Sequence, residues 1–218
     1  MEVGTMPEPV TVQTGCQYYP GFLDRNAQLR LAVALRMLSV EAPFFTSTMP
    51  RTGKPFSVGM TNLGSLGWVS DRAGGYRYQA THPETGRQWP PIPDAVLAVW
   101  RAVADYPQDP EACLVNYYGT GARMGLHQDR DEEDLTAPVV SISLGDACRF
   151  RIGETTRGGP TRSLKLASGD VIVLGGPSRL AFHGVDRLYP GTSTLLAGWF
   201  PEGGRINLTL RRVRRPAD

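Results

Sequence analysis

The sequence predicts a mainly β protein, an antiparallel sandwich with flanking helices (α+β). Glycine and proline together account for 43 of the 218 residues, which is above ordinary usage and typical of a chain with many turns. Short segments rich in β-branched and aromatic residues follow one another after residue 112, as expected for such a sandwich. Two earlier segments repeat their apolar residues with the period of an α-helix. The length fits one large domain or two small ones.

The N-terminal part is predicted to hold one helix. Residues 1–17 are expected to be loosely structured because Pro7 and Pro9 limit regular structure, and residues 17–23 to form a short strand and a turn. Asp24 is a suitable N-cap for a helix that ends near Ser39. This helix has apolar residues on one face, which should pack on a sheet: Leu31, Leu35 and Leu38.

Residues 43–92 are rich in glycine, proline and aromatic residues, and we expect short strands at best. Such a segment is usually a surface elaboration and often a binding lid. His82 belongs to no motif and is expected in a surface loop. A second helix is predicted from Pro93 to about Ala104, with an inward apolar stripe. The stripe comprises Val96, Trp100 and Val103.

The rest of the chain is predicted to form short strands, at residues 113–118, 139–144, 164–166, 171–174, 194–200 and 205–211. The last of these alternates strictly between apolar and polar side chains. Its polar face either lies in water or lines a pocket in a small barrel. In the second case its two arginines, Arg205 and Arg211, would need an anion, because buried guanidinium groups are costly without one. A dicarboxylate supplies one negative group for each arginine.

A possible metal site lies between these strands. His127 and Asp129 are two residues apart, so an extended backbone directs both side chains to one face. With His183 they provide the two imidazoles and one carboxylate of a non-haem Fe(II) centre, which leaves positions open for a cosubstrate and dioxygen. A solvated turn and an unrelated core histidine are the ordinary alternative. Beside a facial triad, the dicarboxylate that two arginines require is 2-oxoglutarate.

Several motifs occur in order along the chain: Met60-Thr61-Asn62, Leu66-Gly67-Trp68, Asn116-Tyr117-Tyr118, His127 to Glu132, Ser141 to Gly145, Gly169-Asp170-Val171, His183-Gly184 and Arg205 to Arg211. Together they resemble the bacterial AlkB family of Fe(II)- and 2-oxoglutarate-dependent nucleic-acid demethylases, over residues 56–212. The resemblance implies a double-stranded β-helix (jelly-roll) core within one catalytic domain, 1–218. We expect an N-terminal extension and helix (1–42), a nucleotide-recognition lid (43–92), a helix and dioxygenase core (93–212) and a basic tail (213–218).

The resemblance also implies roles for the site residues. Fe(II) would be held by His127, Asp129 and His183, with 2-oxoglutarate and O2 as cosubstrates. Arg205, assisted by Tyr118, would bind the distal carboxylate of 2-oxoglutarate. The keto-acid end would be organised by further polar residues, Asn207, Arg211 and Asn116.

For the substrate, the resemblance implies a flipped methylated base between Trp68 and His127. Tyr76 would contact the base and its phosphate, and Met60 would complete the apolar wall. Asp131 would orient Tyr76 or accept from an exocyclic amine. A phosphate contact is implied for Arg157, in the divergent segment 146–163. Ordinary hydrophobic anchoring of Trp68 and Tyr76, and solvation of Asp131, are the alternatives to these roles.

The implied activity is oxidative demethylation of alkylated DNA or RNA, with lesions such as 1-methyladenine and 3-methylcytosine, single strands being preferred. Formaldehyde, succinate and CO2 would be the products. The rivals are an oxygenase of the same fold acting on a protein or small molecule, and a non-catalytic nucleic-acid-binding module. At the basic C-terminal end, the arginines either contact a phosphate backbone or are simply solvated. These are Arg212, Arg214 and Arg215.

Other properties point to a cytoplasmic monomer without a membrane partner. The net charge of +2 is mild. Three scattered cysteines, at positions 16, 113 and 148, suit a reducing compartment and exclude a disulfide framework. No apolar run is long enough for a membrane span, and the first residues lack the pattern of a signal peptide.

Overall fold

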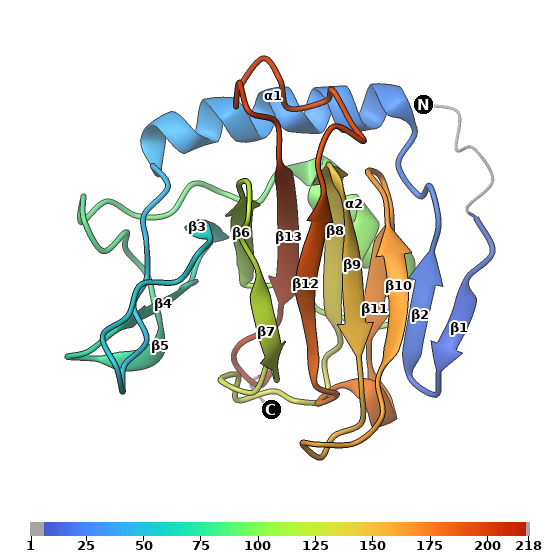
Figure 1. The fold of residues 1–218 in the computed structure, drawn as a ribbon. Coiled ribbons are helices and arrows are strands. Elements are labelled where there is room, and N and C mark those ends of the chain that lie inside the picture. The colour runs from blue at the N-terminus through green and yellow to red at the C-terminus, as the bar shows by residue number, and fades with distance from the viewer. Residues whose placement is uncertain (1–6, 217–218) are drawn as a thin grey trace.

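The computed structural model describes residues 7–216, and two antiparallel sheets face each other in it as a jelly roll (Figure 1). The large sheet has the spatial order β1 (Val10–Gln13), β2 (Cys16–Tyr19), β11 (Val171–Leu174), β8 (Val139–Gly145), β13 (Arg205–Arg211), β6 (Ala112–Tyr118) and β3 (Gly59–Gly64). The small sheet has the order β10 (Arg162–Leu166), β9 (Ala147–Ile152), β12 (His183–Tyr189) and β7 (Met124–His127). A separate hairpin consists of β4 (Gly67–Asp71) and β5 (Gly75–Gln79). One short 3-10 helix, η1 (Gly176–Ser178), precedes β12.

The two predicted helices are confirmed and cover the outer face of the large sheet. The first, α1 (Arg25–Glu41), crosses the sheet in Figure 1, and the Asp24 carboxylate caps it by accepting the Ala27 N–H at 2.7 Å. The second is α2 (Asp94–Val103), which buries Val96, Trp100 and Val103. Both helices pack on the core because their apolar side chains repeat on one face.

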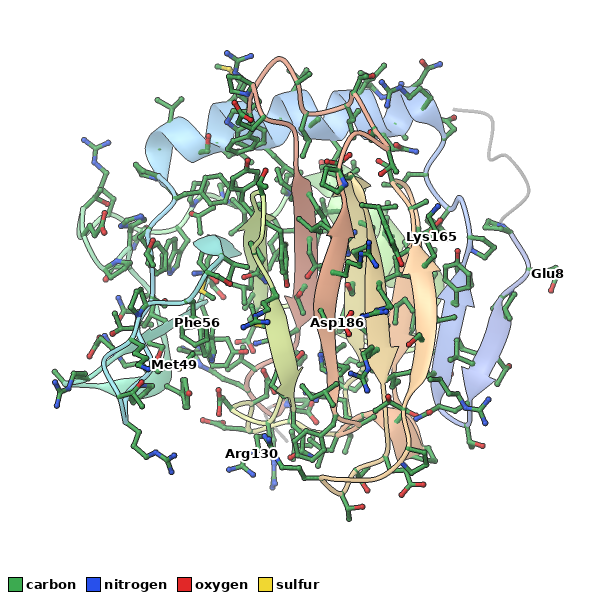
Figure 2. All side chains as sticks on the ribbon, in the orientation of Figure 1. Glu8, Met49, Phe56, Arg130, Lys165 and Asp186 are labelled. Carbon is green, nitrogen blue, oxygen red and sulfur yellow. The ribbon has the colours of Figure 1, made fainter. Side chains whose placement is uncertain are left out.

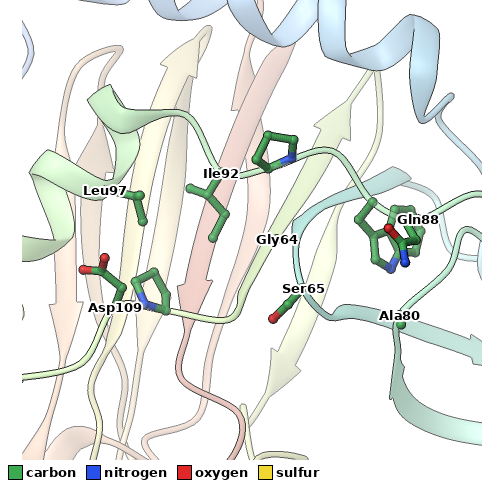
Figure 3. Close-up of a pocket in the computed structure, with 10 residues that line it drawn as sticks. Gly64, Ser65, Ala80, Gln88, Ile92, Leu97 and Asp109 are labelled. Atoms are coloured by element: carbon green, nitrogen blue, oxygen red, sulfur yellow. The ribbon is translucent and has the colours of Figure 1, made fainter.

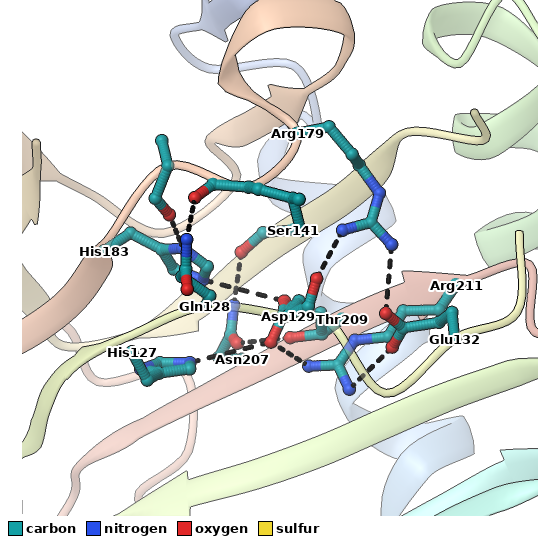
Figure 4. A network of polar contacts seen from close by, with 12 residues as sticks. His127, Gln128, Asp129, Glu132, Ser141, Arg179, His183, Asn207, Thr209 and Arg211 are labelled. Atoms are coloured by element: carbon teal, nitrogen blue, oxygen red, sulfur yellow. Dashed lines mark hydrogen bonds and ion pairs between the residues drawn. The ribbon is translucent and has the colours of Figure 1, made fainter. Parts of the chain in front are cut away.

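Strand β13 lies inside the large sheet, and its two faces contribute to different parts of the molecule. It pairs with β6 on one side and β8 on the other, and all seven of its residues are buried. Its apolar residues, Ile206, Leu208 and Leu210, join the core beneath the helices. Strict alternation then directs its polar residues to the other face of the sheet, and Arg211 and Asn207 lie there in the polar network of Figure 4. The sequence left a solvated polar face possible; the structure buries it.

A second core fills the space between the sheets, while the outer face of the small sheet is charged. Arg149 pairs with Asp186 at 2.7 Å on that face, where Figure 2 labels Asp186 and Lys165. The three cysteines are buried free thiols, as the absence of paired spacing predicted. Burial raises the pKa of Cys16 to about 12, so this thiol is protonated at neutral pH.

Two expectations about secondary structure were wrong, and three strands and one strand pairing had not been predicted. Residues 10–13, expected to be loose, form β1 because they pair with β2; residues 1–6 lie outside the described part. The apolar run 194–200 is not a strand but a series of turns, closed by the Ala197, Trp199 and Phe200 N–H groups. The strands β7, β9 and β12 were not predicted. The expected lid segment 43–92 also contributes β3 to the large sheet.

His82 was expected on the surface and is instead almost fully buried, at 1% exposure. Its Nδ1 accepts the Glu84 and Thr85 N–H groups, so its Nε2 carries the proton and donates to the Pro43 carbonyl at 2.8 Å. The ring also packs against Phe45 and Trp89. His82 therefore ties the start of the lid segment to its end.

Two further features of the fold bear on where a functional site can lie. Neither helix in residues 7–216 is long and apolar enough to cross a bilayer. A hollow of about 560 Å³ lies between the lid segment and α2 (Figure 3). Its lining is mainly apolar, and its carboxylate, Asp109, is already paired with Arg101. The groups with metal-binding chemistry lie elsewhere.

We expect Leu208→Ala to lower the free energy of unfolding by about 2–5 kcal/mol, because it leaves a cavity in a fully buried central strand. Urea denaturation of the full chain measures this. Val33→Ala, on the exposed face of α1, should change stability by less than about 0.5 kcal/mol. Equal losses for the two variants would contradict the assignment of β13 to the core.

Candidate functional site

The pairing of β7 with β12 brings two histidines together at the end of the small sheet. His127 and His183 are direct partners in this register, and their ring centroids are 4.6 Å apart. Asp129 follows β7 by two residues, and its carboxylate oxygens lie 3.7 Å from the His127 Nε2 and 3.6 Å from the His183 Nε2. Ligand atoms of all three residues lie within 4.8 Å of one another. The predicted triad is therefore assembled.

Both histidines are held in the tautomer that a metal requires. The Nδ1 of His127 is 2.9 Å from the Gly125 carbonyl, and the Nδ1 of His183 is 2.9 Å from the Ala181 carbonyl. Since a carbonyl can only accept, each Nδ1 carries a proton and each Nε2 keeps its lone pair. Desolvation, with the neighbouring His183, lowers the pKa of His127 to about 4. The imidazole of His127 is therefore neutral at pH 7 and able to bind a metal.

The carboxylate of Asp129 is buried and only half satisfied. Its Oδ1 accepts from the Arg211 Nη2 at 2.7 Å, whereas its Oδ2 has no hydrogen-bond partner among the described residues. Burial alone would raise the pKa of Asp129, but the Arg211 guanidinium beside it holds that pKa well below its usual value. An ionised oxygen without a partner, beside two imidazole lone pairs, fits a divalent cation. Two histidines and one carboxylate fit Fe(II) in particular.

A buried ionic network that the sequence did not reveal lies behind the triad (Figure 4). Arg179 donates to the Asp129 carbonyl at 2.6 Å, the Ala137 carbonyl at 2.7 Å and the Glu132 carboxylate at 3.0 Å. The Glu132 carboxylate also lies 3.4 Å from Arg211. Glu132 ended a motif of the family resemblance but was given no role, and Arg179 lay in no motif. Only the fold brings these two residues together.

Arg205 forms a second electropositive site on β13. It is 1% exposed and faces no carboxylate; its Nη2 donates to the Ser143 hydroxyl at 2.9 Å, and its Nε and Nη1 have no partner within residues 7–216. Tyr118 is its direct partner on β6 and is also buried. A buried guanidinium with free donors fits the carboxylate of a small ligand. The role of Arg205 and Tyr118 toward the distal carboxylate of 2-oxoglutarate stays a prediction.

The other predicted cosubstrate residues lie along the same two strands. Asn207 is paired with Asn116 across β13 and β6, and the Asn116 Oδ1 has no partner in the described chain. The amide of Asn207 donates to the Ser141 hydroxyl at 2.6 Å and accepts from Thr209 at 2.9 Å. The roles of Asn207, Asn116 and Arg211 toward a keto acid stay predictions.

The hairpin of β4 and β5, in the segment expected to form a lid, carries an aromatic row. Trp68 stacks on Tyr76 with ring centroids 5.6 Å apart and an interplanar angle of 21°, and Phe56 packs edge-on against Trp68 at 6.3 Å. Figure 2 labels Phe56 on the lid side of the molecule. The carboxylate of Asp131 accepts from the Trp68 indole N–H at 2.8 Å, so its structural partner is Trp68 and not the predicted Tyr76. Tyr76 is 52% exposed.

The structure gives positions for the remaining predicted substrate residues, and their roles stay predictions. Met60 is buried on β3, at 1% exposure. Arg157 is exposed, and its guanidinium lies 5.0 Å from the centre of the Phe182 ring. Near the C-terminal end, Arg212 lies 3.5 Å from the Glu111 carboxylate, while the exposed Arg215 donates to the Glu133 carbonyl at 3.2 Å.

Comparisons with known proteins agree with this geometry. A model of the 2OG-Fe(II) oxygenase superfamily matches residues 15–211. The alpha-ketoglutarate-dependent dioxygenase AlkB homolog of Caulobacter vibrioides is 58% identical over 207 residues, 95% of this chain and 91% of that protein. The alpha-ketoglutarate-dependent dioxygenase AlkB of Escherichia coli is 40% identical over 192 residues, 86% of each chain. The structure of OsALKBH1 superposes with a TM-score of 0.79 at 31% identity, covering 94% of this chain and 100% of that one.

We expect Mn(II), a redox-stable substitute for Fe(II), to raise the Tm of the native protein and not that of His183→Ala. At a hundredfold excess over the dissociation constant, the gain of about 2.7 kcal/mol corresponds to about 5–10 °C. Differential scanning fluorimetry measures the shift.

The matched control for this metal prediction is His82→Asn, which removes a buried histidine outside the triad. It should lower the Tm but keep the metal-induced shift. A full shift in His183→Ala would rule out this residue as a ligand.

Proposed function

The chain belongs to the AlkB family of Fe(II)- and 2-oxoglutarate-dependent dioxygenases, and from this we propose that it demethylates N-alkylated bases in nucleic acid. The observation that carries the proposal is the hydrogen bond from Trp68 to Asp131. Asp131 is two residues from the metal ligand Asp129, so an aromatic platform is held directly beside the metal centre. Such a platform is what a flipped base needs.

Each part of the site has a function in this reaction. Bound Fe(II) supplies the redox chemistry that couples decarboxylation of 2-oxoglutarate to oxidation of an N-methyl group by O2, after which formaldehyde leaves. His127, Asp129 and His183 hold the metal, and the pairing with Arg211 keeps the Asp129 carboxylate ionised. Arg205 and Tyr118 bind the distal carboxylate of the cosubstrate. The buried polar face of β13 keeps this chemistry away from bulk water.

Relatives that match about half of this chain support a nucleic-acid substrate. One is named a tRNA demethylase, from Schizosaccharomyces pombe, at 39% identity over 112 residues. Another is named a DNA N(6)-methyladenine demethylase, from Arabidopsis thaliana, at 42% identity over 108 residues. We propose 1-methyladenine and 3-methylcytosine as lesions, in single strands, where a base is available without unpairing. We further propose that the protein acts as a cytoplasmic monomer, which suits its three free cysteines.

The charge of the lid segment also favours a nucleic-acid strand. Residues 43–92 contain five arginines and lysines against two acidic residues, a net charge of +3, whereas the whole chain has only +2. Asp71 is paired with Arg77 at 2.8 Å. The side chain of Arg72 lies against Gly53, in the loop that carries Arg51 and Lys54, and none of these three cations forms an ion pair among residues 7–216. We propose that they contact phosphates beside the target base.

The decisive assay is formaldehyde release from single-stranded DNA containing 1-methyladenine or 3-methylcytosine, with Fe(II), 2-oxoglutarate and O2. We expect release by the native protein and a loss of at least about a hundredfold for His127→Ala, because a missing metal ligand removes the reaction centre. Consumption of 2-oxoglutarate without formaldehyde would move the search to a protein or small-molecule substrate. Inactivity of an iron-loaded protein in both assays would refute the proposal.

The lid charges predict the salt dependence of oligonucleotide binding. Removing one phosphate contact by Lys54→Ala or Arg72→Ala should reduce the slope of log Kd against log salt by about 0.7 for a single strand. Fluorescence anisotropy at several salt concentrations measures the slope. Arg30→Ala, an exposed arginine on α1, is the matched control and should leave the slope unchanged. Equal slopes for all three variants would contradict a phosphate contact by the lid.

A further inference from the structure

Tyr78 belongs to the lid but its hydroxyl is bonded to the core. It lies on β5, and its hydroxyl accepts from the Arg211 Nη1 at 3.0 Å and donates to the Glu132 carboxylate. Burial, only partly offset by Arg211, raises the pKa of Tyr78 well above its usual value, so the phenol keeps the proton that it donates. One lid side chain therefore reaches two buried charges of the jelly roll.

Arg211 connects this tyrosine to the metal ligand. Its Nη1 donates to Tyr78, while its Nη2 donates to the Asp129 Oδ1 at 2.7 Å. The guanidinium is planar and rigid, so the contact at one nitrogen restricts the direction of the other. With the fork held in this way, Arg211 occupies Oδ1 and leaves Oδ2 without a protein partner. That oxygen is the one available to a metal.

The substrate platform is joined to the same tyrosine through the lid hairpin. Trp68 and Tyr78 are direct partners in the register of β4 and β5. Trp68 is bonded to Asp131 and Tyr78 to Glu132, which is the next residue along the chain. A base that binds to Trp68 and shifts it therefore also shifts the pair of strands, β4 and β5, that positions Tyr78. Lid and metal centre share two adjacent anchoring points.

We propose that Tyr78 is a positioning residue that couples nucleotide binding on the lid to metal binding at the triad. When the lid is ordered, the Tyr78 hydroxyl stays hydrogen-bonded to Arg211. Arg211 in turn keeps the Asp129 carboxylate in the orientation that accepts the metal. Linkage requires the effect to be reciprocal, so a bound metal must tighten nucleotide binding by the same factor. This inference rests on the proposed function, because it takes a nucleic-acid strand as the ligand of the lid.

The test measures the Kd of Mn(II), with 2-oxoglutarate present, in the absence and presence of a saturating single-stranded oligonucleotide containing 3-methylcytosine. Mn(II) prevents turnover, so the readout is binding and not activity. We expect the oligonucleotide to tighten Mn(II) binding to the native protein about fivefold or more. In Tyr78→Phe the ratio of the two constants should fall to about 1. The variant keeps the ring, and Arg211 keeps Glu132 as a partner, so the fold is retained.

Tyr106→Phe is the matched control, because the Tyr106 hydroxyl also donates to a buried carboxylate, that of Asp134, outside the network. It should keep the native ratio, whereas a purely structural effect of a lost hydroxyl would alter both variants alike. A native ratio retained in Tyr78→Phe would overturn the coupling. If the oligonucleotide binds, and is demethylated when Fe(II) replaces Mn(II), but the native ratio is 1, the coupling fails and the proposed function stands. If no oligonucleotide binds, both fail.

Discussion

The ion pair between Arg211 and Asp129 is the constraint on which the site depends. It joins β13, an interior strand of the large sheet, to the segment that leaves the small sheet, so the position of the Asp129 carboxylate beside the two histidines depends on both sheets. Two buried charges would be costly in isolation. Glu132 and Arg179 complete the arrangement, and these four groups have no net charge in total. A dication and a dianionic cosubstrate that enter together then add no net charge to the interior.

The local patterns of the sequence indicated the last strand and the metal ligands, and the ordered motifs of the family resemblance selected them over the ordinary alternatives. Two patterns depend only on a locally extended backbone and could therefore be predicted: the alternation along residues 205–211 and the two-residue spacing of His127 and Asp129. The burial of the polar face of β13 could not be obtained from alternation alone, since a half-solvated strand has the same pattern. The structure decided between the two possibilities, because it buries Arg205, Asn207, Thr209 and Arg211 as well as the apolar residues of β13.

The errors share one physical cause, which is that pairing partners distant in sequence override local preference. Residues 194–200 are apolar enough for a strand, but Leu195 and Leu196 are buried in the same core as α1 and the backbone forms turns. His82 is polar and lies in a loop, yet two backbone donors and one carbonyl satisfy both nitrogens and make its burial possible. Arg179 and Glu132 are 47 residues apart, so no local pattern indicated that they meet. The hydrogen bond between Asp131 and Trp68 likewise joins residues that are 63 positions apart in the sequence.

The three buried cysteines have a consequence for the durability of a catalyst that consumes oxygen. Thiol oxidation begins with the thiolate and requires access to it. Burial raises the pKa values of Cys16, Cys113 and Cys148, and none of the three is open to solvent. Peroxide that escapes an unproductive cycle therefore meets no reactive sulfur of this kind on its way out. The packing that excludes water from the interior also protects the enzyme against damage by its own by-products.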